Sequence, residues 1–193
     1  MDELVPRPGQ RVIVCGPSCS GKSTLAARLG ETLGLPFIEL DALFWRPNWK
    51  EPTEEEFAAQ IDEATAGDRW VVAGNYVRHM TPIAWPRADT IIWLDLGLPL
   101  VTWRVLRRSW RRWRTNELLW GTNYERFFPQ LKLWDKNSLI TFNVTHHRSR
   151  RARYAAAMED PQWAHIAFIR LRSPHAVEAF VAGLTPAYGR GVR

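Results

Sequence analysis

The stretch Gly16-Pro-Ser-Cys-Ser-Gly-Lys-Ser23 matches the pattern G-x4-G-K-S, and the sequence on either side gives the match its meaning. The run Arg11–Cys15 before it is rich in β-branched residues and predicts a strand, whereas Lys22–Leu33 has apolar residues at helical spacing. A glycine-rich turn between a strand and a helix directs backbone N–H groups toward an anion at the positive end of the helix dipole. The sequence therefore predicts a site for the phosphates of a nucleotide.

The positions of this loop have separate expected roles. We expect the ammonium group of Lys22 to meet the β- and γ-phosphates of ATP and the hydroxyl of Ser23 to bind Mg²⁺. The residues expected to surround ATP in and beside the loop are Gly16, Ser18, Cys19, Ser20, Gly21, Lys22, Ser23 and Thr24. The pattern Gly-x-Gly-x-x-Gly is absent, which disfavours a dinucleotide site.

Further strands and helices alternate along the chain. We expect strands at 36–40, 70–73, 89–94 and 166–171, and helices from the capping box Thr53–Glu56 to about 67, over 99–114, and after Ser173-Pro174. Alternation of this kind predicts an α/β fold with a parallel sheet covered by helices on both faces and with sites at the carboxyl ends of the strands.

Length and composition exclude several classes of protein. The 193 residues fit one domain, and 46% hydrophobic with 24% charged residues excludes intrinsic disorder. No apolar run approaches the roughly 18 residues of a membrane span, and residues 1–10 do not resemble a signal peptide. We therefore expect a cytoplasmic protein with no membrane partner.

Three carboxylates at predicted strand ends are candidates for the Mg²⁺ site: Glu39, Asp41 and Asp95. Glu39 and Asp41 are two residues apart, so an extended strand would place both on one face. Asp41 could then orient the hydroxyl of a substrate, or it could cap a helix over 42–45. Asp95 follows the apolar run Ile-Ile-Trp-Leu and could hold Mg²⁺, or it could simply cap a helix or turn.

The acceptor of the phosphoryl group is expected where the third strand ends, at Gly74-Asn75-Tyr76-Val77-Arg78. We assign Asn75, Arg78, Asp41 and Trp45 to the substrate. Arg78 would clamp a phosphate if the acceptor has one, and its alternative is a solvated loop arginine.

A strongly basic segment follows the fourth strand. Residues 104–153 hold eleven Arg and two Lys against three acids, although the whole chain has a net charge of only +6. In the predicted helix, Trp103, Leu106, Trp110 and Trp113 form one apolar stripe, and Arg104, Arg107, Arg108, Arg111 and Arg112 fill the opposite side. No acid occurs from Leu96 to Asn116, so an anion from elsewhere is expected: either the nucleotide or a nucleic-acid backbone.

In this order, the motifs resemble the P-loop small-molecule kinases, and among them the adenylate-kinase-like group often labelled DNA topology modulation proteins. The motifs are the loop 16–23, Leu40-Asp-Ala-Leu-Phe-Trp45 with Arg46-Pro-Asn-Trp49, Trp70-Val-Val-Ala-Gly-Asn-Tyr76, Trp85-Pro-Arg-Ala-Asp89 before Trp93-Leu-Asp95, and the arginine-rich helix. The resemblance implies a P-loop nucleoside-triphosphate hydrolase fold like that of nucleoside monophosphate kinases, with five parallel strands and a mobile lid that brings arginines over the phosphates.

The resemblance also implies one kinase domain over 1–193, with a core of about 10–114 and 148–185 and a lid over about 115–147. Related kinases usually have an aspartate immediately before the glycine that ends strand three, where this chain has Ala73. The Mg²⁺ role therefore shifts to the Glu39/Asp41 pair, which resembles the paired acids of shikimate-kinase-like enzymes, or to Asp95.

These observations predict an ATP-dependent phosphotransferase that moves the γ-phosphoryl group to a small acceptor, with a nucleotide among the candidate acceptors. The residues expected to act in catalysis are Lys22, Asp41, Arg108, Arg148 and Arg151, and Arg104 is expected to contact ATP. Arg107 is an alternative near the start of the basic helix, and Arg150 is an alternative after the lid. The alternative is a nucleic-acid-binding regulator switched by a nucleotide. A third interpretation is a nucleotide-binding protein whose catalysis has decayed, for which Ala73 is the only indication.

Overall fold

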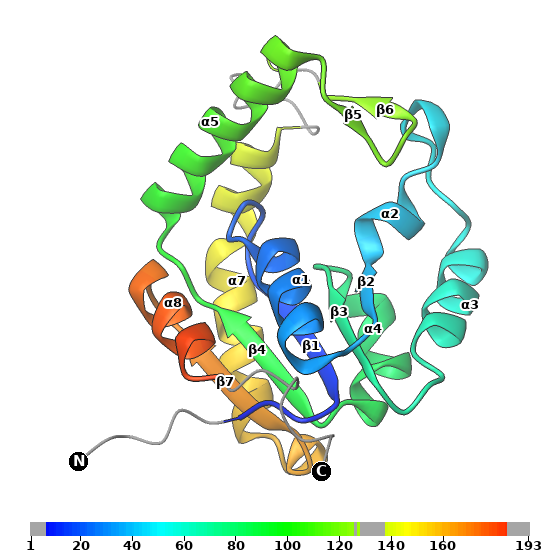
Figure 1. The fold of residues 1–193 in the computed structure, drawn as a ribbon, viewed down its shortest axis with the longest axis vertical. Coiled ribbons are helices and arrows are strands. Elements are labelled where there is room, and N and C mark those ends of the chain that lie inside the picture. Colours follow the sequence, from blue (N-terminus) through cyan, green and yellow to red (C-terminus); the bar gives the residue numbers. More distant parts are fainter. Residues whose placement is uncertain (1–6, 126, 128–137, 185–193) are drawn as a thin grey trace, which may run out of the picture.

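A five-stranded parallel sheet forms the centre of the protein, as seen in a computed structural model that describes residues 7–125, 127 and 138–184 (Figure 1). The strand order is β2-β3-β1-β4-β7, and every neighbouring pair is parallel. The strands are β1 (Arg11–Cys15), β2 (Phe37–Glu39), β3 (Trp70–Ala73), β4 (Thr90–Leu94) and β7 (Ala167–Leu171). The predicted α/β class and the five-stranded parallel sheet are confirmed.

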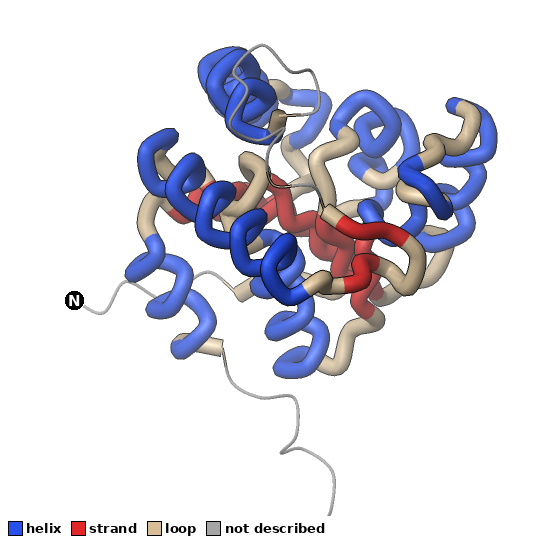
Figure 2. Tube along the Cα trace, turned by 90° about the horizontal axis from the view of Figure 1, so that it is seen from above, coloured by secondary structure: helices blue, strands red, loops and turns tan. Residues whose placement is uncertain are grey.

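Helices lie on both sides of this sheet (Figure 2). They are α1 (Lys22–Leu33), α2 (Leu40–Phe44), α3 (Glu54–Ala64), α4 (Val77–Ile83), α5 (Leu98–Thr115), α7 (Leu139–Glu159) and α8 (Pro174–Ala182), with short 3-10 turns η1 (Pro47–Trp49), η2 (Trp85–Arg87) and η3 (Pro161–Trp163). Among the described helices, none combines the length and the apolar content needed to cross a membrane.

The alternation of side chains along β1 divides the core into two layers. Val12 and Val14 face α1 and α8, where they pack with Leu25 and Phe180. Ile13 and Cys15 face the opposite side, in a layer built from α3, α4 and α7. Because both faces of the strand are buried, its sequence is a continuous apolar run, as expected for a parallel sheet.

The ends of several elements agree with the prediction. The bounds of β1, α1 and β3 are those expected, and Gly34 ends α1 in the left-handed conformation. The capping box of α3 is confirmed, since the Thr53 hydroxyl accepts from Glu56 N at 3.2 Å and Glu56 Oε2 accepts from Thr53 N at 2.8 Å. Helix α8 begins as predicted, because the Ser173 hydroxyl caps Ala176 N at 3.0 Å.

The second strand is shorter than predicted, and this changes the position of Asp41. Strand β2 ends at Glu39, and Asp41 lies in the first turn of α2, so the expectation that both carboxylates share one face of a strand is wrong. Leu40 is buried against Gly74, where an added Cβ would lie 2.8 Å from Leu40 Cδ1. The backbone of Asp41 belongs to the helix instead, because its carbonyl accepts from Trp45 N at 3.0 Å.

The region predicted as a lid contains two kinds of structure. After α5, a hairpin is formed by β5 (Leu118–Leu119) and β6 (Asn123–Tyr124), which pair antiparallel. Helix α7 begins at Leu139, so the last residues of the predicted lid are the first turns of a 21-residue helix. Residues 126 and 128–137 lie outside the part of the chain described here.

The close approach of β1 and β4 makes Gly16 sensitive to substitution. Gly16 has a φ of +149°, and an added Cβ would lie 2.7 Å from the carbonyl oxygen of Leu94. We expect Gly16→Ala to lower the free energy of unfolding by about 1–3 kcal/mol, because the loop must shift away from β4. A urea titration measures this. Gly67→Ala is the control, since nothing lies within 4 Å of its added Cβ. Equal stability of the two variants would contradict the close approach.

Candidate active site

The loop 16–23 lies between β1 and α1 at the carboxyl edge of the sheet, as predicted. Gly21 occupies the N-cap position of α1 with a φ of 99°, and no side chain caps the helix there. The first N–H groups of α1 are therefore open to an anion. The hydroxyl oxygen of Ser20 is buried in the loop without a hydrogen-bond partner. Buried polar atoms are nearly always paired, so this atom indicates that a ligand completes the loop.

Lys22 extends back along the loop, and its Nζ donates to Pro17 O at 3.0 Å. Burial lowers the pKa of Lys22 to about 8, against the effect of Asp41, which raises it, while Arg150 and Arg108 lower it further. The ammonium group is thus poorly hydrated and close to two guanidinium groups. An anion bound in the loop would relieve both costs.

Three arginines from two helices complete the positive charge around this loop. Arg104 of α5 donates from Nη1 to Ser20 O at 3.0 Å. Arg108 of α5 and Arg150 of α7 each have a buried guanidinium nitrogen without a hydrogen-bond partner, Nε and Nη1 respectively. The predicted positions of Arg104 and Arg108 beside the loop are therefore supported by the geometry. Arg150, the predicted alternative to Arg148 and Arg151, joins them.

One face of α7 lies against the loop and the sheet. It presents Asn143, His147, Arg150, Arg151 and Tyr154, which recur at helical spacing. The side chain of Asn143 is fully buried and bridges the backbone of Ser18: Oδ1 accepts from Ser18 N at 3.0 Å, and Nδ2 donates to Ser18 O at 3.2 Å. An amide positioned in this way fixes the tip of the phosphate loop from a helix 125 residues away.

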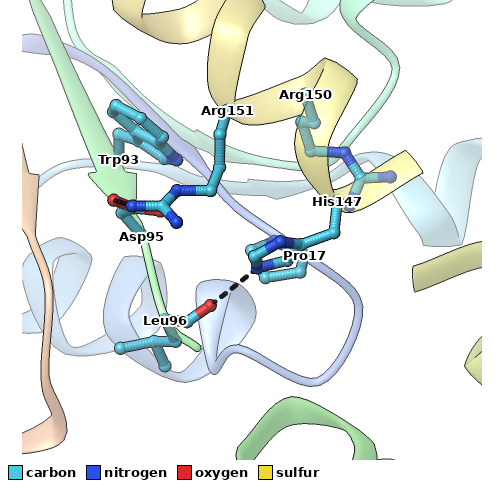
Figure 3. Close-up of a pocket in the computed structure, with 7 residues that line it drawn as sticks. All are labelled: Pro17, Trp93, Asp95, Leu96, His147, Arg150 and Arg151. Carbon is cyan, nitrogen blue, oxygen red and sulfur yellow. Dashed lines mark hydrogen bonds and ion pairs between the residues drawn. The ribbon is translucent and has the colours of Figure 1, made fainter. Parts of the chain in front are cut away.

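A small cavity separates this helix face from the end of β4 (Figure 3). Its walls are Pro17, Trp93, Asp95, Leu96, His147, Arg150 and Arg151. His147 Nε2 lies 3.3 Å from Leu96 O, the contact drawn as a dashed line. Arg151 lies over Asp95, whereas Arg150 points away from this pair.

Asp95 acts as the centre of an ion-pair network. Arg151 Nε lies 2.8 Å from Oδ1 and Arg170 Nη2 lies 2.6 Å from Oδ2, and the carboxylate is 2% exposed. Arg170 also stacks over Trp93, 4.3 Å from the ring centroid. Both carboxylate oxygens are thus occupied by guanidinium groups, so the predicted metal role for Asp95 is not supported. The same contacts hold Arg151, predicted as catalytic, in a structural pair.

Asp41 lies on the other side of Lys22 and is held by a tyrosine. The Tyr76 hydroxyl donates to Asp41 Oδ1 at 2.8 Å. Burial, followed by the charge of Asp41, raises the pKa of Tyr76 well above its usual range, which keeps this donor protonated. Nearby, Oδ1 of Asn75 is buried without a hydrogen-bond partner. Asp41 and Asn75 are therefore brought to one region, as predicted, and Tyr76 is an additional residue that the sequence did not assign.

Three tryptophans lie in the region of Glu39 and Asp41. The ring of Trp49 lies 5.3 Å from that of Trp45 and 6.0 Å from that of Trp120, and Trp120 Nε1 donates to Glu39 Oε2 at 3.4 Å. The hairpin β5–β6 is anchored there, because Asn123 Oδ1 accepts from Trp49 N at 2.9 Å. The predicted substrate residue Trp45 is thus one wall of an aromatic cluster.

Arg78 and Arg148, which were predicted to act at the site, lie away from it. The side chain of Arg78 is 84% exposed and faces Glu54 at 3.8 Å, because Val77 and Met80 turn toward the core at the start of α4. The alternative of a solvated arginine fits this better than the predicted phosphate clamp. Arg148 is exposed on α7, off the face that meets the loop. The structure does not bring either residue to the loop.

The two sides of α5 are arranged differently from the prediction. The buried positions are Val101, Val105 and Ser109, whereas Trp103 and Trp110 are 53% and 47% exposed. Arg104 and Arg108 face the loop, whereas Arg107 and Arg111 are exposed and the aromatic stripe faces outward. Two acids near the hairpin supply part of the negative charge that was expected to neutralise these arginines. Glu117 forms ion pairs with Arg111 and Arg112. Glu125 forms an ion pair with Arg112 and accepts a hydrogen bond from Ser109.

The chain matches no protein-family profile and no curated protein. It is similar in structure to shikimate kinase from Bacteroides thetaiotaomicron, with a TM-score of 0.54, 16% sequence identity, and coverage of 90% of this chain and 94% of that one. It is also similar to a gluconokinase from Sinorhizobium meliloti 1021, with a TM-score of 0.52, 20% identity, and coverage of 93% of each chain. The α/β fold with a five-stranded parallel sheet is therefore the fold of P-loop kinase structures.

The Asn143 bridge predicts that α7 stabilises the phosphate loop. Asn143→Ala would leave the N–H and carbonyl groups of Ser18 without partners, so we expect the free energy of unfolding to fall by about 1–3 kcal/mol and ATP binding to weaken. Urea titration and calorimetry measure the two effects. The control is Val144→Ala, at a half-exposed position of the same helix. A variant at Asn143 that binds ATP as the wild type does would contradict the bridge.

Proposed function

We propose that this protein is an ATP-dependent phosphotransferase that moves the γ-phosphoryl group of ATP, with Mg²⁺, to a hydroxyl group of a small molecule. The observation that supports this most directly is the opposition of charges across the loop. Lys22, Arg104, Arg108 and Arg150 gather at the loop, and Asp41 faces Lys22 from the acceptor side. Phosphoryl transfer needs mainly positioning and charge stabilisation, and these residues supply both.

The cationic groups have distinct tasks in this proposal. Lys22 neutralises the β- and γ-phosphates, and its low hydration strengthens the interaction. Arg108 and Arg150 have unpaired guanidinium nitrogens that can donate to phosphate oxygens as charge moves from the γ-phosphoryl group to the leaving ADP. Arg104 holds the loop through Ser20 O, which keeps the backbone N–H groups directed toward the phosphates.

The acceptor side would orient the attacking hydroxyl. Asp41 accepts one hydrogen bond from Tyr76, and a carboxylate has room for more. Its free capacity would receive the hydroxyl of the acceptor. Tyr76 acts as a positioning residue, because it fixes the rotation of the Asp41 carboxylate.

The residues present also fit a magnesium ion. Mg²⁺ in such sites is usually bound by one or two protein oxygens together with substrate phosphates and water. Ser23, in the first turn of α1, and Asp41 or Glu39 would hold it. When bound, the ion would neutralise charge on the transferring phosphoryl group.

A second candidate function is the nucleotide-switched nucleic-acid binder. It is favoured by the outward face of α5, where Trp103 and Trp110 are exposed and Arg107 stacks on Trp103 at 5.3 Å. In that case the phosphate loop would bind a nucleotide without an acceptor. Turnover that depends on an acceptor distinguishes the kinase from the regulator.

The lowered pKa of Lys22 predicts a pH-dependent affinity for ATP. At pH 7 the ammonium group is charged, and as the pH rises through about 8 it loses its proton in the free protein. We therefore expect binding of ATP with Mg²⁺ at pH 9 to be roughly tenfold weaker than at pH 7, measured by calorimetry. Lys22→Ala should bind weakly at both values, and Lys50→Ala, at an exposed position, should follow the wild type. Unchanged ATP binding by Lys22→Ala would overturn the assignment of the loop.

Substitutions of Asp41 and Asp95 are expected to impair different properties, activity in the first case and stability in the second. We expect Asp41→Asn to reduce acceptor-dependent ADP release at least about hundredfold, while ATP affinity at pH 7 stays within about threefold. Asp95→Asn should instead lower the free energy of unfolding by about 2–3 kcal/mol, toward the lower end for a buried pair because Arg151 is half exposed.

The measurements are a coupled ADP assay over nucleosides, nucleoside monophosphates, sugars and sugar acids, and a urea titration. A stable but inactive Asp95→Asn variant beside a fully active Asp41→Asn variant would reverse the two roles. ADP release that no acceptor increases would favour the nucleic-acid binder.

A further inference from the structure

Glu39, Asp41 and the indoles of Trp45, Trp49 and Trp120 lie together on the acceptor side. We propose from this arrangement that the acceptor is a polyhydroxylated molecule with an apolar ring or carbon face and no negative charge, such as a neutral sugar, a sugar alcohol or a nucleoside. This inference rests on the proposed function and names the substrate class for that same site.

The two carboxylates have unused capacity to accept hydrogen bonds. Glu39 receives one bond from Trp120 and Asp41 receives one from Tyr76. Both lie close enough to Tyr76 to raise its pKa, so their negative fields overlap. An ionised carboxylate offers about four acceptor positions, and hydroxyl groups are donors that match them. The carboxylate that does not hold Mg²⁺ would repel a carboxylate or phosphate on the acceptor.

Two arginines near this side are paired with acids or turned away, and Lys22, which borders Asp41, is directed to the phosphate loop through Pro17 O. Arg46 pairs with Glu56 at 2.9 Å, and the exposed Arg78 faces Glu54. The cations with unpaired nitrogens, Arg108 and Arg150, lie on the phosphate-loop side. The described residues thus separate a positive region for ATP from a negative region for the acceptor, which favours an uncharged molecule in the second position.

The indoles offer flat apolar surfaces beside these carboxylates. Trp45 and Trp49 meet edge to face, as do Trp49 and Trp120, so ring faces remain for a ligand. Trp49 is 38% exposed, and Trp45 and Trp120 are partly exposed. Large aromatic faces with a few polar groups form a common kind of small-molecule site, and they suit the carbon face of a sugar or the plane of a base.

This aromatic wall is held in place before any ligand binds. The buried Asn123 accepts from Trp49 N and donates to Arg46 O at 3.1 Å, and Trp49 Nε1 donates to Tyr124 O at 3.2 Å. Fixing the indoles in advance lowers the entropy that a ligand must lose on binding. The hairpin β5–β6 is therefore part of the acceptor site.

The test compares acceptors that share a carbon skeleton and differ in negative charge at one position, where the charged member also lacks a hydroxyl or the sugar ring. We pair glucose with gluconate and with glucose 6-phosphate, glucitol with glucitol 6-phosphate, and adenosine with adenosine 5′-monophosphate. Binding is followed by tryptophan fluorescence with a non-hydrolysable ATP analogue present, and turnover by ADP release. We expect the uncharged member of a responding pair to have at least about tenfold higher kcat/KM.

Variants test the origin of this preference. Glu39→Gln should reduce the discrimination against the charged member at least about threefold, whereas Glu55→Gln, at an exposed position of α3, should leave it unchanged. If ATP binds and the charged members are preferred, or if no uncharged acceptor binds, this inference is wrong while the phosphate site stands. If ATP itself does not bind, the proposed function fails instead.

Discussion

Repulsion among cations is the constraint that the rest of this structure must satisfy. Lys22, Arg108 and Arg150 lie near one another at a loop with little water, and burial lowers the pKa of both Lys22 and Arg150. The protein offsets part of this cost at Lys22 with the charge of Asp41 and with Pro17 O, which accepts from Lys22 Nζ. The remaining unfavourable free energy is relieved when an anion binds, because a phosphate chain supplies the negative partner that these cations lack. It therefore contributes to the affinity for that anion.

Helices far apart in sequence must be held together for this charge to gather. Helix α7 is held by Asn143 on the loop, His147 on the end of β4 and Arg151 on Asp95. Helix α5 packs against α7 and is linked to the hairpin through Arg112 and its acids. The acid that resembled a metal ligand in sequence therefore serves to hold the helix that delivers Arg150.

The local parts of the site could be predicted from sequence, and the long-range parts could not. The strand, loop and helix over 11–33 follow from residues in immediate succession, and the structure has the expected bounds. Asp41 was expected on a strand because the alternation of apolar and polar residues does not reveal the helical hydrogen bond from Trp45 N to Asp41 O.

On α7 and α5, composition does not fix which face turns inward. The helix phase that selects Arg150 over Arg148 depends on Asn143 meeting a loop 125 residues away. On α5, amphipathic reasoning predicts buried tryptophans, but Arg104 and Arg108 turn toward the loop and the rings of Trp103 and Trp110 are exposed.

The two cysteines differ in accessibility, and this difference offers a way to mark the loop chemically. Cys15 is enclosed in the sheet, where burial raises the pKa of its thiol to about 12, and it hydrogen-bonds with Tyr154. Cys19 is partly exposed in the loop, in a left-handed conformation, and burial raises the pKa of its thiol against the opposing charges of Arg108 and Lys22. A slow thiol reagent thus meets a single accessible sulfur in the native chain. A fluorophore or spin label attached there would report on ligands in the loop without any engineered residue.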